Sequence, residues 1–414
     1  MNHITLDLHI FDANTQTTET ANAGNDLSAE MKTYYEKRLI DIATPKLVHD
    51  QFGDFYPVPK NGGKTVEFRR YSPLGKATTP LTEGVTPDGN SLNVTTVTAE
   101  VEQYGDWIGL SDMFDMTAID NNVVQATRLL GNQAGRTLDS VTREVLHGGT
   151  NVRYAPAGGA EITARADITA EAKLTPELIF RAKADLAAMN ADPIDDSYVA
   201  IIHPYAAFDL MRSEEWIDVH KYADPDSIYS GEIGKLGGVR FIETSEAKIV
   251  GPAVVSDNLS RLHVADDTAS GSKTIKVSEV LNARTLTKAI PVYINGVANT
   301  IVAIAPGSTG TTLSLGTALA EACPAGSILC GRGAGKDGSA VFCTLVLGAH
   351  AYGTTEIEGG GLRHIIKQLG YGDDPLDQRS SCGWKATKAA ERLVEAYMVR
   401  LESGSAYSAS ADSN

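Results

Sequence analysis

The sequence between residues 64 and 106 is the feature that most constrains the fold of this chain. Its flanks alternate apolar and polar residues as half-buried β-strands do, with apolar side chains at Val66, Phe68, Val97, Ala99 and Val101. The middle, residues 72–91, holds three prolines, three glycines and only three large apolar residues, which are Leu74, Leu81 and Val85. A connection of about twenty residues is uncommon in a compact domain and is usually functional or disordered. The sequence therefore predicts a long β-hairpin with little core of its own.

A long amphipathic helix is predicted directly after this hairpin. Thr117 to Asp120 resembles a capping box, and Gly148-Gly149 ends the pattern. Between them apolar residues recur every three or four positions, at Ile119, Val123, Ala126, Leu130, Ala134, Leu138, Val141 and Val145. At about 1.5 Å per residue, a helix over 117–148 is roughly 45 Å long.

The remainder of the chain alternates helical and extended patterns. Helices are expected from Ser28 to about residue 42, from Thr175-Pro176 to about Met189, and over 205–212. Strands are expected over 198–202, 238–244, 340–347 and 362–366. This alternation indicates an α+β or α/β layer. Residues 386–401 fit both a helix and a strand, and the polar tail after Ser403 is expected to be loose.

Residues 265–335 differ in composition from their surroundings. They contain one aromatic residue, Tyr293, and are rich in Ala, Gly, Ser and Thr. Asn295-Gly296 lies between two apolar runs, which is a strong hairpin signal. The segment therefore reads as a small all-β insertion.

Composition and motifs argue against several classes of function. The net charge of −16 argues against a non-specific nucleic-acid-binding surface. The four cysteines form no CxxC pair, and no metal-binding, phosphate-loop or nucleophile-elbow motif is complete. The glycine-rich run 331–337 reads as a mobile linker, and Asp192, Asp195 and Asp196 as a solvated turn. We therefore expect no catalytic residues, cofactor, metal, signal peptide or membrane segment.

Arg69 and Arg70 lie on the predicted hairpin and allow two interpretations. A partner carboxylate could accept bidentate hydrogen bonds from them, or they could be solvated charges that protect an open strand from aggregation. The residues by themselves do not decide between the two.

Several stretches, taken in order, resemble the major capsid (coat) proteins of tailed bacteriophages, in particular the branch typified by the coat protein of coliphage N-four. The matching stretches are GKTVEFRRYSPLGKATTPLTEGVTP (63–87), YGDWIGLSDMFD (104–115), the long helix ending in LHGG (146–149), HPYAAFDLM (203–211), GGVRFIET (237–244), CTLVLGAHAYGTTEI (343–357) and residues 374–403. No single stretch is diagnostic, so the resemblance depends on the ordered set. Residues 265–335 have no match in it.

The resemblance implies the α+β, HK97-like (Hong Kong 97) coat fold with an added all-β insertion. Its expected parts, in chain order, are an N-terminal arm (1–27), a helix entering the peripheral domain (28–59), a hairpin called the E-loop (60–108) and a spine helix with the peripheral domain (109–190). They continue with an axial domain (191–262), the insertion (263–337), a return through both domains (338–403) and a tail (404–414). In this fold the return segment joins a sheet, so the resemblance favours a strand over a helix for the ambiguous residues 386–401.

The resemblance also implies a function. Copies of the chain would assemble, as pentamers and hexamers, into an icosahedral virion shell around double-stranded DNA in the cytoplasm of a bacterial host. Portal, scaffolding and decoration proteins are possible partners, and no membrane is involved. The alternatives are an encapsulin-like compartment shell, another phage structural protein such as a tail component, and a carbohydrate-binding module or enzyme.

Two sets of residues are the candidates for roles in such a shell. The hairpin would lie over a neighbouring subunit, which makes the candidates for assembly Arg69, Arg70, Leu74, Leu81, Val85 and Tyr104. A negatively charged inner wall would repel the DNA, so basic residues should be enriched there. The spine helix offers Arg128, Arg136 and Arg143, whose intervals of eight and seven residues place them on roughly one face. An internal salt bridge from Asp139 to Arg143 is the simpler alternative for the last of these.

Overall fold

The computed structural model divides the chain into two units, each with its own internal contacts. Unit 1 comprises residues 1–142 and 352–393, and unit 2 comprises residues 143–351 and 394–414. The residues that the structure describes are 15–16, 48–71, 74, 76–78, 80, 83–84, 89–117, 122–213, 215–216, 234–257, 259–282, 286, 288–367 and 376–414. The predicted helix from Ser28 and the capping residues 118–120 lie outside this set.

Unit 1 is built on a six-stranded sheet around one long central strand. β20 (Arg379–Arg392) pairs along one edge with β5 (Glu102–Ser111) and along the other with β19 and β18. The remaining strands of this sheet are β1 (Thr15–Gln16), β2 (Asp54–Phe55), β18 (Tyr352–Thr355) and β19 (Arg363–Lys367). The C-terminal segment that fitted both a helix and a strand is thus mostly extended, as the resemblance implied.

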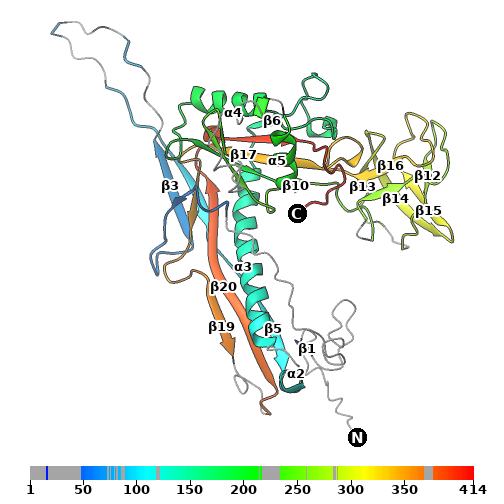
Figure 1. The fold of residues 1–414 in the computed structure, drawn as a ribbon, viewed down its shortest axis with the longest axis horizontal. Helices are drawn as coiled ribbons and strands as arrows, with labels where there is room; N and C mark the ends of the chain where they lie inside the picture. Colours follow the sequence, from blue (N-terminus) through cyan, green and yellow to red (C-terminus); the bar gives the residue numbers. More distant parts are fainter. Residues whose placement is uncertain are drawn as a thin grey trace. The chain divides into compact units, whose positions relative to one another are not determined.

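A long helix covers one face of this sheet. α3 (Asn122–His147) follows the short helix α2 (Asp112–Thr117) and runs alongside β5 and β20 (Figure 1). Leu130, Ala134 and Leu138 on the helix pack against Cys382 and Trp384 of β20. The four-residue spacing puts the three helix residues on one stripe, which is why the sequence pattern identified this helix.

Unit 2 contains a mixed seven-stranded sheet that is covered on both faces. Its strands are β6 (Val152–Tyr154), β21 (Met398–Ser403), β17 (Val341–Leu347), β7 (Tyr198–Ile202), β9 (Val239–Glu243), β8 (Lys235–Leu236) and β10 (Ile249–Val250). Every residue of β7, β17 and β21 is buried. Unbroken apolar runs such as Tyr198–Ile202 are typical of strands buried on both faces.

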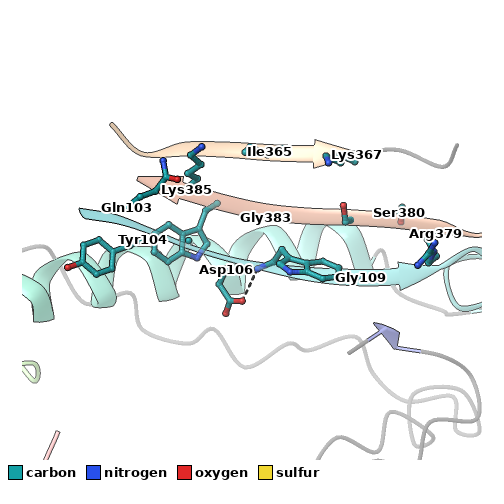
Figure 2. A pocket seen from close by; sticks show the side chains of 14 residues that line it. Gln103, Tyr104, Asp106, Gly109, Ile365, Lys367, Arg379, Ser380, Gly383 and Lys385 are labelled. Atoms are coloured by element: carbon teal, nitrogen blue, oxygen red, sulfur yellow. Dashed lines mark hydrogen bonds between the residues drawn. The ribbon is translucent and has the colours of Figure 1, made fainter. Parts of the chain in front are cut away.

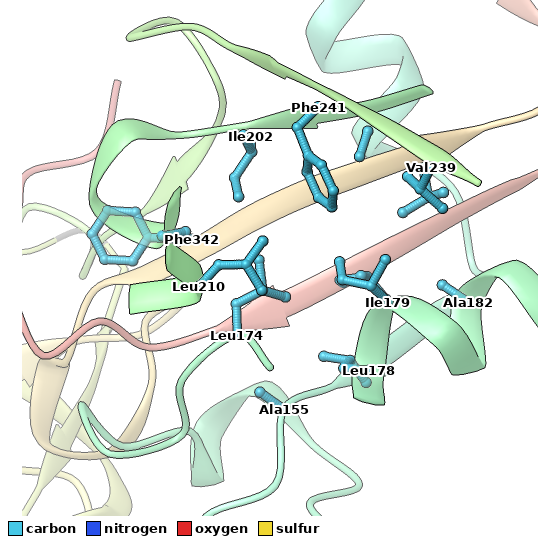
Figure 3. Packing of buried hydrophobic residues seen from close by; sticks show 14 of the residues in the cluster. Ala155, Leu174, Leu178, Ile179, Ala182, Ile202, Leu210, Val239, Phe241 and Phe342 are labelled. Atoms are coloured by element: carbon cyan, nitrogen blue, oxygen red, sulfur yellow. The ribbon is translucent and has the colours of Figure 1, made fainter. Parts of the chain in front are cut away.

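Two helices contribute to the core of unit 2. α4 (Pro176–Ala188) begins at Thr175, whose side chain accepts a hydrogen bond from the amide of Leu178, and α5 (Pro204–Met211) begins at His203 in the same manner. Figure 3 shows side chains from α4 and α5 pointing at the sheet, where Ile179 and Leu210 belong to the same buried cluster as Phe241. The described residues of unit 2 also include three short 3-10 turns: η1 (Arg165–Asp167), η2 (Lys336–Gly338) and η3 (Glu395–Tyr397).

The C-terminal residues 405–414 are bound along unit 2, so the expectation of a loose tail is wrong. The Ala406 amide donates to Asp209 Oδ2 at 3.0 Å, and Asn414 Nδ2 donates to the Ala247 carbonyl oxygen at 2.9 Å. The tail is held in place because its polar groups find partners in distant segments of the same unit.

The predicted all-β insertion is a closed antiparallel barrel within unit 2. Its six strands, in sheet order, are β11 (Arg261–His263), β16 (Ile328–Gly331), β13 (Ile290–Ile294), β14 (Val297–Gly307), β15 (Gly310–Leu315) and β12 (Thr274–Val277). The amide of Ala265 donates to Lys276 and that of Ser278 donates to His263, which joins the last strand to the first. The barrel therefore has its own apolar core, which includes Leu262, Ile301 and Leu313.

Candidate assembly surface

The predicted hairpin is present, and its inner half packs on its own unit. β3 (Thr65–Tyr71) pairs with β4 (Val94–Glu100) in antiparallel register, with Phe68 opposite Val97. Phe68 and Ala99 are buried against Val58 and Ala389. The expectation that the hairpin has little core of its own is therefore wrong for this inner half, because its alternating apolar face is long enough to join the unit 1 core.

The outer half of the hairpin lacks such a core among the residues that the structure describes. Tyr71, Leu74, Leu92 and Val94 are all exposed, Leu92 to 71% and Leu74 to 57%. Leu81 and Val85, two of the predicted assembly residues, lie outside the described residues. Large apolar side chains gathered on one projecting element are typical of a surface that is covered by a partner.

The charged side chains of the hairpin lie on its open surfaces. Arg69 and Arg70 are exposed, and the Nη2 atom of Arg69 lies 4.0 Å from Oε2 of Glu67. Lys64 donates a hydrogen bond of 2.5 Å to Glu100 across the two strands. This bond raises the pKa of the Lys64 ammonium and lowers that of the Glu100 carboxyl, so both groups stay charged. The two arginines are thus placed where a partner can reach them.

A groove of about 850 Å³ runs along β5, β19 and β20 of unit 1. Figure 2 shows the three strands side by side, with α3 behind them. The register places Gly383 between Trp107 and Ile365, so these residues share the face of the sheet opposite to Trp384, which packs on α3. Trp107 and Ile365 are 49% and 41% exposed. The groove is therefore a partly apolar trough on a sheet face that no helix of unit 1's described residues covers.

Glycines shape the floor of this groove. A Cβ atom at Gly383 would lie 3.0 Å from the Cβ of Trp107, and one at Gly105 would lie 2.6 Å from the carbonyl oxygen of Trp384. Side chains at these positions would fill the trough or force the strands apart. Gly105, Trp107 and Gly109 alternate along β5, and this glycine–tryptophan alternation is the sequence signal that could have identified the groove, which the sequence analysis missed.

The groove is bordered mainly by basic groups. Lys367, Arg379 and Lys385 line it, together with one acidic residue, Asp106. Asp106 accepts hydrogen bonds from the Trp107 amide at 2.8 Å and from Gln133 Nε2 of α3 at 2.6 Å. Because the single carboxylate is held by its own unit, the groove favours an acidic or neutral partner.

Tyr104, the remaining predicted assembly residue, is half-buried at one end of the groove. Its ring packs with the α3-facing cluster, and its hydroxyl donates to Glu102 Oε2 at 3.0 Å. Partial burial and the Glu102 carboxylate raise the pKa of the hydroxyl. Tyr104 thus serves the packing of its own unit as well as lining the groove.

The three arginines of the spine helix do not form one exposed set. Arg128 and Arg136 are exposed, but Arg143 is only 4% exposed. Arg143 donates to the carbonyl oxygens of Glu246 and Asn414, both at 2.9 Å. The expectation that Arg143 is accessible is therefore wrong, because its guanidinium donates hydrogen bonds to two backbone segments of unit 2. Asp139, its expected partner, accepts a 2.7 Å bond from His49 instead.

Other motifs considered in the sequence do not form sites. The run 331–337 is an ordered turn, in which the Lys336 amide donates to Ile168 and the Gly335 amide to Ser339, so the prediction of a mobile linker is wrong. Within the described part of the chain, no three or more His, Cys, Asp or Glu side chains are grouped to hold a metal ion. Across that same part, no helix combines the length and hydropathy needed to cross a bilayer.

Comparison with known proteins identifies the fold. Residues 94–285 match the family model described as phage capsid protein, which is somewhat less than half of the chain. No curated protein sequence matches.

Among solved structures, the capsid of cyanophage Pam1 superposes with a TM-score of 0.55 at 13% identity, covering 95% of this chain and 100% of that one. The capsid of Ralstonia phage GP4 superposes with a TM-score of 0.53 at 12% identity, covering 94% of this chain and 98% of that one. The capsid of cyanophage P-SCSP1u superposes with a TM-score of 0.52 at 13% identity, covering 90% of this chain and 93% of that one. The predicted α+β, HK97-like fold is thereby confirmed.

Proposed function

We infer that this chain is the major capsid protein of a bacteriophage and that its copies form the shell of the virion. One observation carries the inference: the phage capsid family model matches residues 94–285, and the backbone follows phage capsid subunits over at least 90% of both chains. The role is structural, and the chain is not an enzyme.

The outer half of the hairpin and the open sheet face are the two surfaces through which we propose that copies join. The hairpin of one copy would lie over the groove of the next and cover Trp107 and Ile365. In the sequence, the connection between β3 and β4 carries two acidic residues, Glu83 and Asp88, against one basic residue, Lys76, and basic side chains border the groove. Opposite charges orient such a contact and raise its rate of formation.

This head-to-tail contact suits a closed shell. Because the two surfaces differ, each copy can bind one neighbour and be bound by another, and such contacts produce rings when the rotation closes. Contacts that are weak singly become strong together when every subunit makes several. We propose pentamers and hexamers as the rings, in an icosahedral shell assembled in the cytoplasm of a bacterial host.

The genome is the second proposed partner. We propose that the shell encloses double-stranded DNA and that Arg128 and Arg136, exposed on α3, face it and make weak, non-specific phosphate contacts. Their exposure supports the proposal, and because a chain with a net charge of −16 would otherwise repel DNA, we expect basic residues to be gathered on the inner wall. Portal, scaffolding and decoration proteins would act on the same shell, and membership of the branch typified by the coliphage N-four coat protein is part of this proposal.

The direct test is to express the full chain, purify it, and examine it by sedimentation and electron microscopy. Closed particles of uniform size are expected. A stable monomer or dimer under all assembly conditions would contradict the proposal. If particles form in infected cells, their contents separate a virion shell, which holds DNA, from an encapsulin-like compartment, which holds a cargo enzyme.

A further inference from the structure

The strand β19 of unit 1 has an open edge among the residues that the structure describes. One side of β19 pairs with β20, and no described strand pairs with its other side. Figure 2 shows β19 as the outermost of the three strands along the groove. All five of its residues are exposed, including Ile365 at 41% and Ile366 at 52%. An exposed edge of this kind presents unpaired backbone groups to which a further strand can hydrogen-bond.

The charge of β19 limits which strand can pair with this edge. Arg363 and Lys367 are basic, and the strand has no acidic residue. If two copies paired through β19 in antiparallel register about Ile365, Arg363 of each would lie opposite Lys367 of the other, and like charges directly opposite are destabilising. Positive charges on an open edge protect it in this way from pairing with itself. The edge therefore favours an acidic strand.

The N-terminal sequence of the chain has the properties of such a strand. Its apolar residues alternate strictly with polar ones, at Ile4, Leu6, Leu8 and Ile10. This period is that of a strand with one apolar face. Residues 1–31 contain five acidic residues and no Lys or Arg. Residues 4–10 are therefore a candidate strand of the sign that the β19 edge favours.

The edge of β5 in the same chain is a poor site for this segment. Thr15 of β1 pairs in parallel with Gly109 of β5. Continuing that register toward the N-terminus would place Asp12 opposite Asp106, where two like charges would repel. Residues 102–108 contain a second acidic residue, Glu102, and no basic one. Charge therefore favours the β19 edge over the β5 edge.

The segment is too short to reach the β19 edge of its own chain. The strand registers align Thr15, Gly109, Ser381 and Lys367 in one row across the sheet. A strand added beyond Lys367 would lie four strand spacings, or about 19 Å, from Thr15. The five steps of chain from Ile10 to Thr15 span at most about 18 Å when fully extended, and a path around the sheet is longer than this straight line. Only the segment of another copy has the length to pair there.

We propose that residues 4–10 of one copy add as a strand to the β19 edge of a neighbouring copy. The backbones of the two strands supply the hydrogen bonds, and Asp7 and Asp12 supply charges opposite to those of β19. Because Ile365 and Ile366 point to opposite faces of the sheet, the apolar side of the added strand meets an exposed isoleucine in either orientation. The contact rests on the proposed assembly of copies and is separate from the contact between hairpin and groove.

Cross-linking between full-length copies tests the proposal. The photoreactive residue p-benzoylphenylalanine replaces Leu8 in one sample and His9, on the other face of the segment, in a second. Isotope-labelled and unlabelled chains are mixed, assembled and irradiated, and the joined peptides are identified by mass spectrometry. We expect cross-links to residues 363–367, with the two isotopes combined in one product. Products that join the segment only to residues 102–108 of the same chain, or no product with 363–367, would overturn the proposal.

Charge reversal and rescue provide the second measurement. Arg363→Glu with Lys367→Glu should lower the yield of the β19 cross-link roughly tenfold, because two attractive pairs become repulsive. Adding Asp7→Lys with Asp12→Lys should restore the yield. The matched control is Lys273→Glu with Lys288→Glu, two exposed lysines of the barrel, and should leave it unchanged.

The rescue is the decisive result, because Lys367 also borders the groove. A yield that the first reversal leaves unchanged, or that the second reversal fails to restore, would contradict the charge-matched contact. The outcome is also distinct from that of the proposed function. Cross-links between copies that form no closed particles would support this contact and contradict the shell, and closed particles without the β19 cross-link would do the reverse.

Discussion

Replacing Leu74 and Leu92 by serine tests whether the outer hairpin is covered by a neighbouring copy. Fully burying a leucine side chain is worth about 2 kcal/mol. The two side chains are 57% and 71% exposed in the single chain, so more than half of this value is left for a partner. For the pair, the lost contact is about 2.5 kcal/mol per hairpin. Since 1.4 kcal/mol corresponds to a tenfold change in an equilibrium constant, the concentration needed for assembly should rise roughly 60-fold.

The assay is the threshold concentration for particle formation, followed by light scattering and sedimentation. The subunit itself should lose about 1.5 kcal/mol, because the remaining 43% and 29% of the two side chains are already buried in the single chain. Thermal unfolding of the unassembled chain checks this. The matched control is Val280→Ser with Val297→Ser, two exposed apolar residues of the barrel. An unchanged threshold in the hairpin variant, or an equal rise in the barrel variant, would refute the reasoning.

Three further predictions concern other parts of the chain. Reversing both Arg69 and Arg70 to Glu should block particle formation, because we expect these two arginines to bind a neighbour's carboxylates and not the basic rim of the groove. The free energy of unfolding should change by no more than about 0.5 kcal/mol, since both side chains are exposed. Normal particles from this variant would argue against an interface role. Deleting residues 254–331 and joining Ala253 to Arg332 through a short glycine linker should leave a folded chain, because the barrel has a core separate from that of the remaining residues and Ala253 and Arg332 are already hydrogen-bonded. Circular dichroism and thermal unfolding measure this, and an unfolded deletion variant would contradict the prediction. Burial raises the pKa of the Cys343 thiol to about 12 and that of Cys330 to about 11, so both should resist a thiol reagent at pH 8 in the folded chain and react in urea. Because the unfolded thiols ionise near 9, stability should fall as the pH rises from about 9 to 12, and an unchanged unfolding midpoint over this range would contradict the assignment.

Periodic segments were predictable because their pattern is local. The α3 stripe of Leu130, Ala134 and Leu138, the Thr175 cap of α4 and the Asn295-Gly296 turn of the barrel each depend on residues only a few positions apart. The side chains that such segments bury follow from the helix and strand periods. These predictions therefore agree with the structure to within a few residues.

The charged residues were predictable only in part, because the partner of a charge is set by residues far away in the sequence. Arg143 and Arg136 look alike on a helical pattern, yet Arg143 is buried because residues 246 and 414 supply its acceptors. Asp139 binds the backbone amides of Val48 and His49, about ninety positions earlier. Glu402 is fully buried between Arg165 and Arg400 for the same reason. A buried charge needs a partner, but the sequence does not state which one.

The sequence by itself determined the long helix α3, the helices α4 and α5, strands such as β3, β4, β7 and β17, the presence of a separate all-β insertion and the hairpin with few large apolar residues between its strands. It left residues 386–401 open between a helix and a strand. The properties that it determined follow from side-chain periodicity and turn residues, which act over one or two turns of chain. The tertiary structure decided where the hairpin stops packing on its own unit, the closure of the barrel, the glycine-floored groove and the binding of residues 405–414 along unit 2. Each of these depends on strand register and on contacts between distant segments, which only a folded chain brings together.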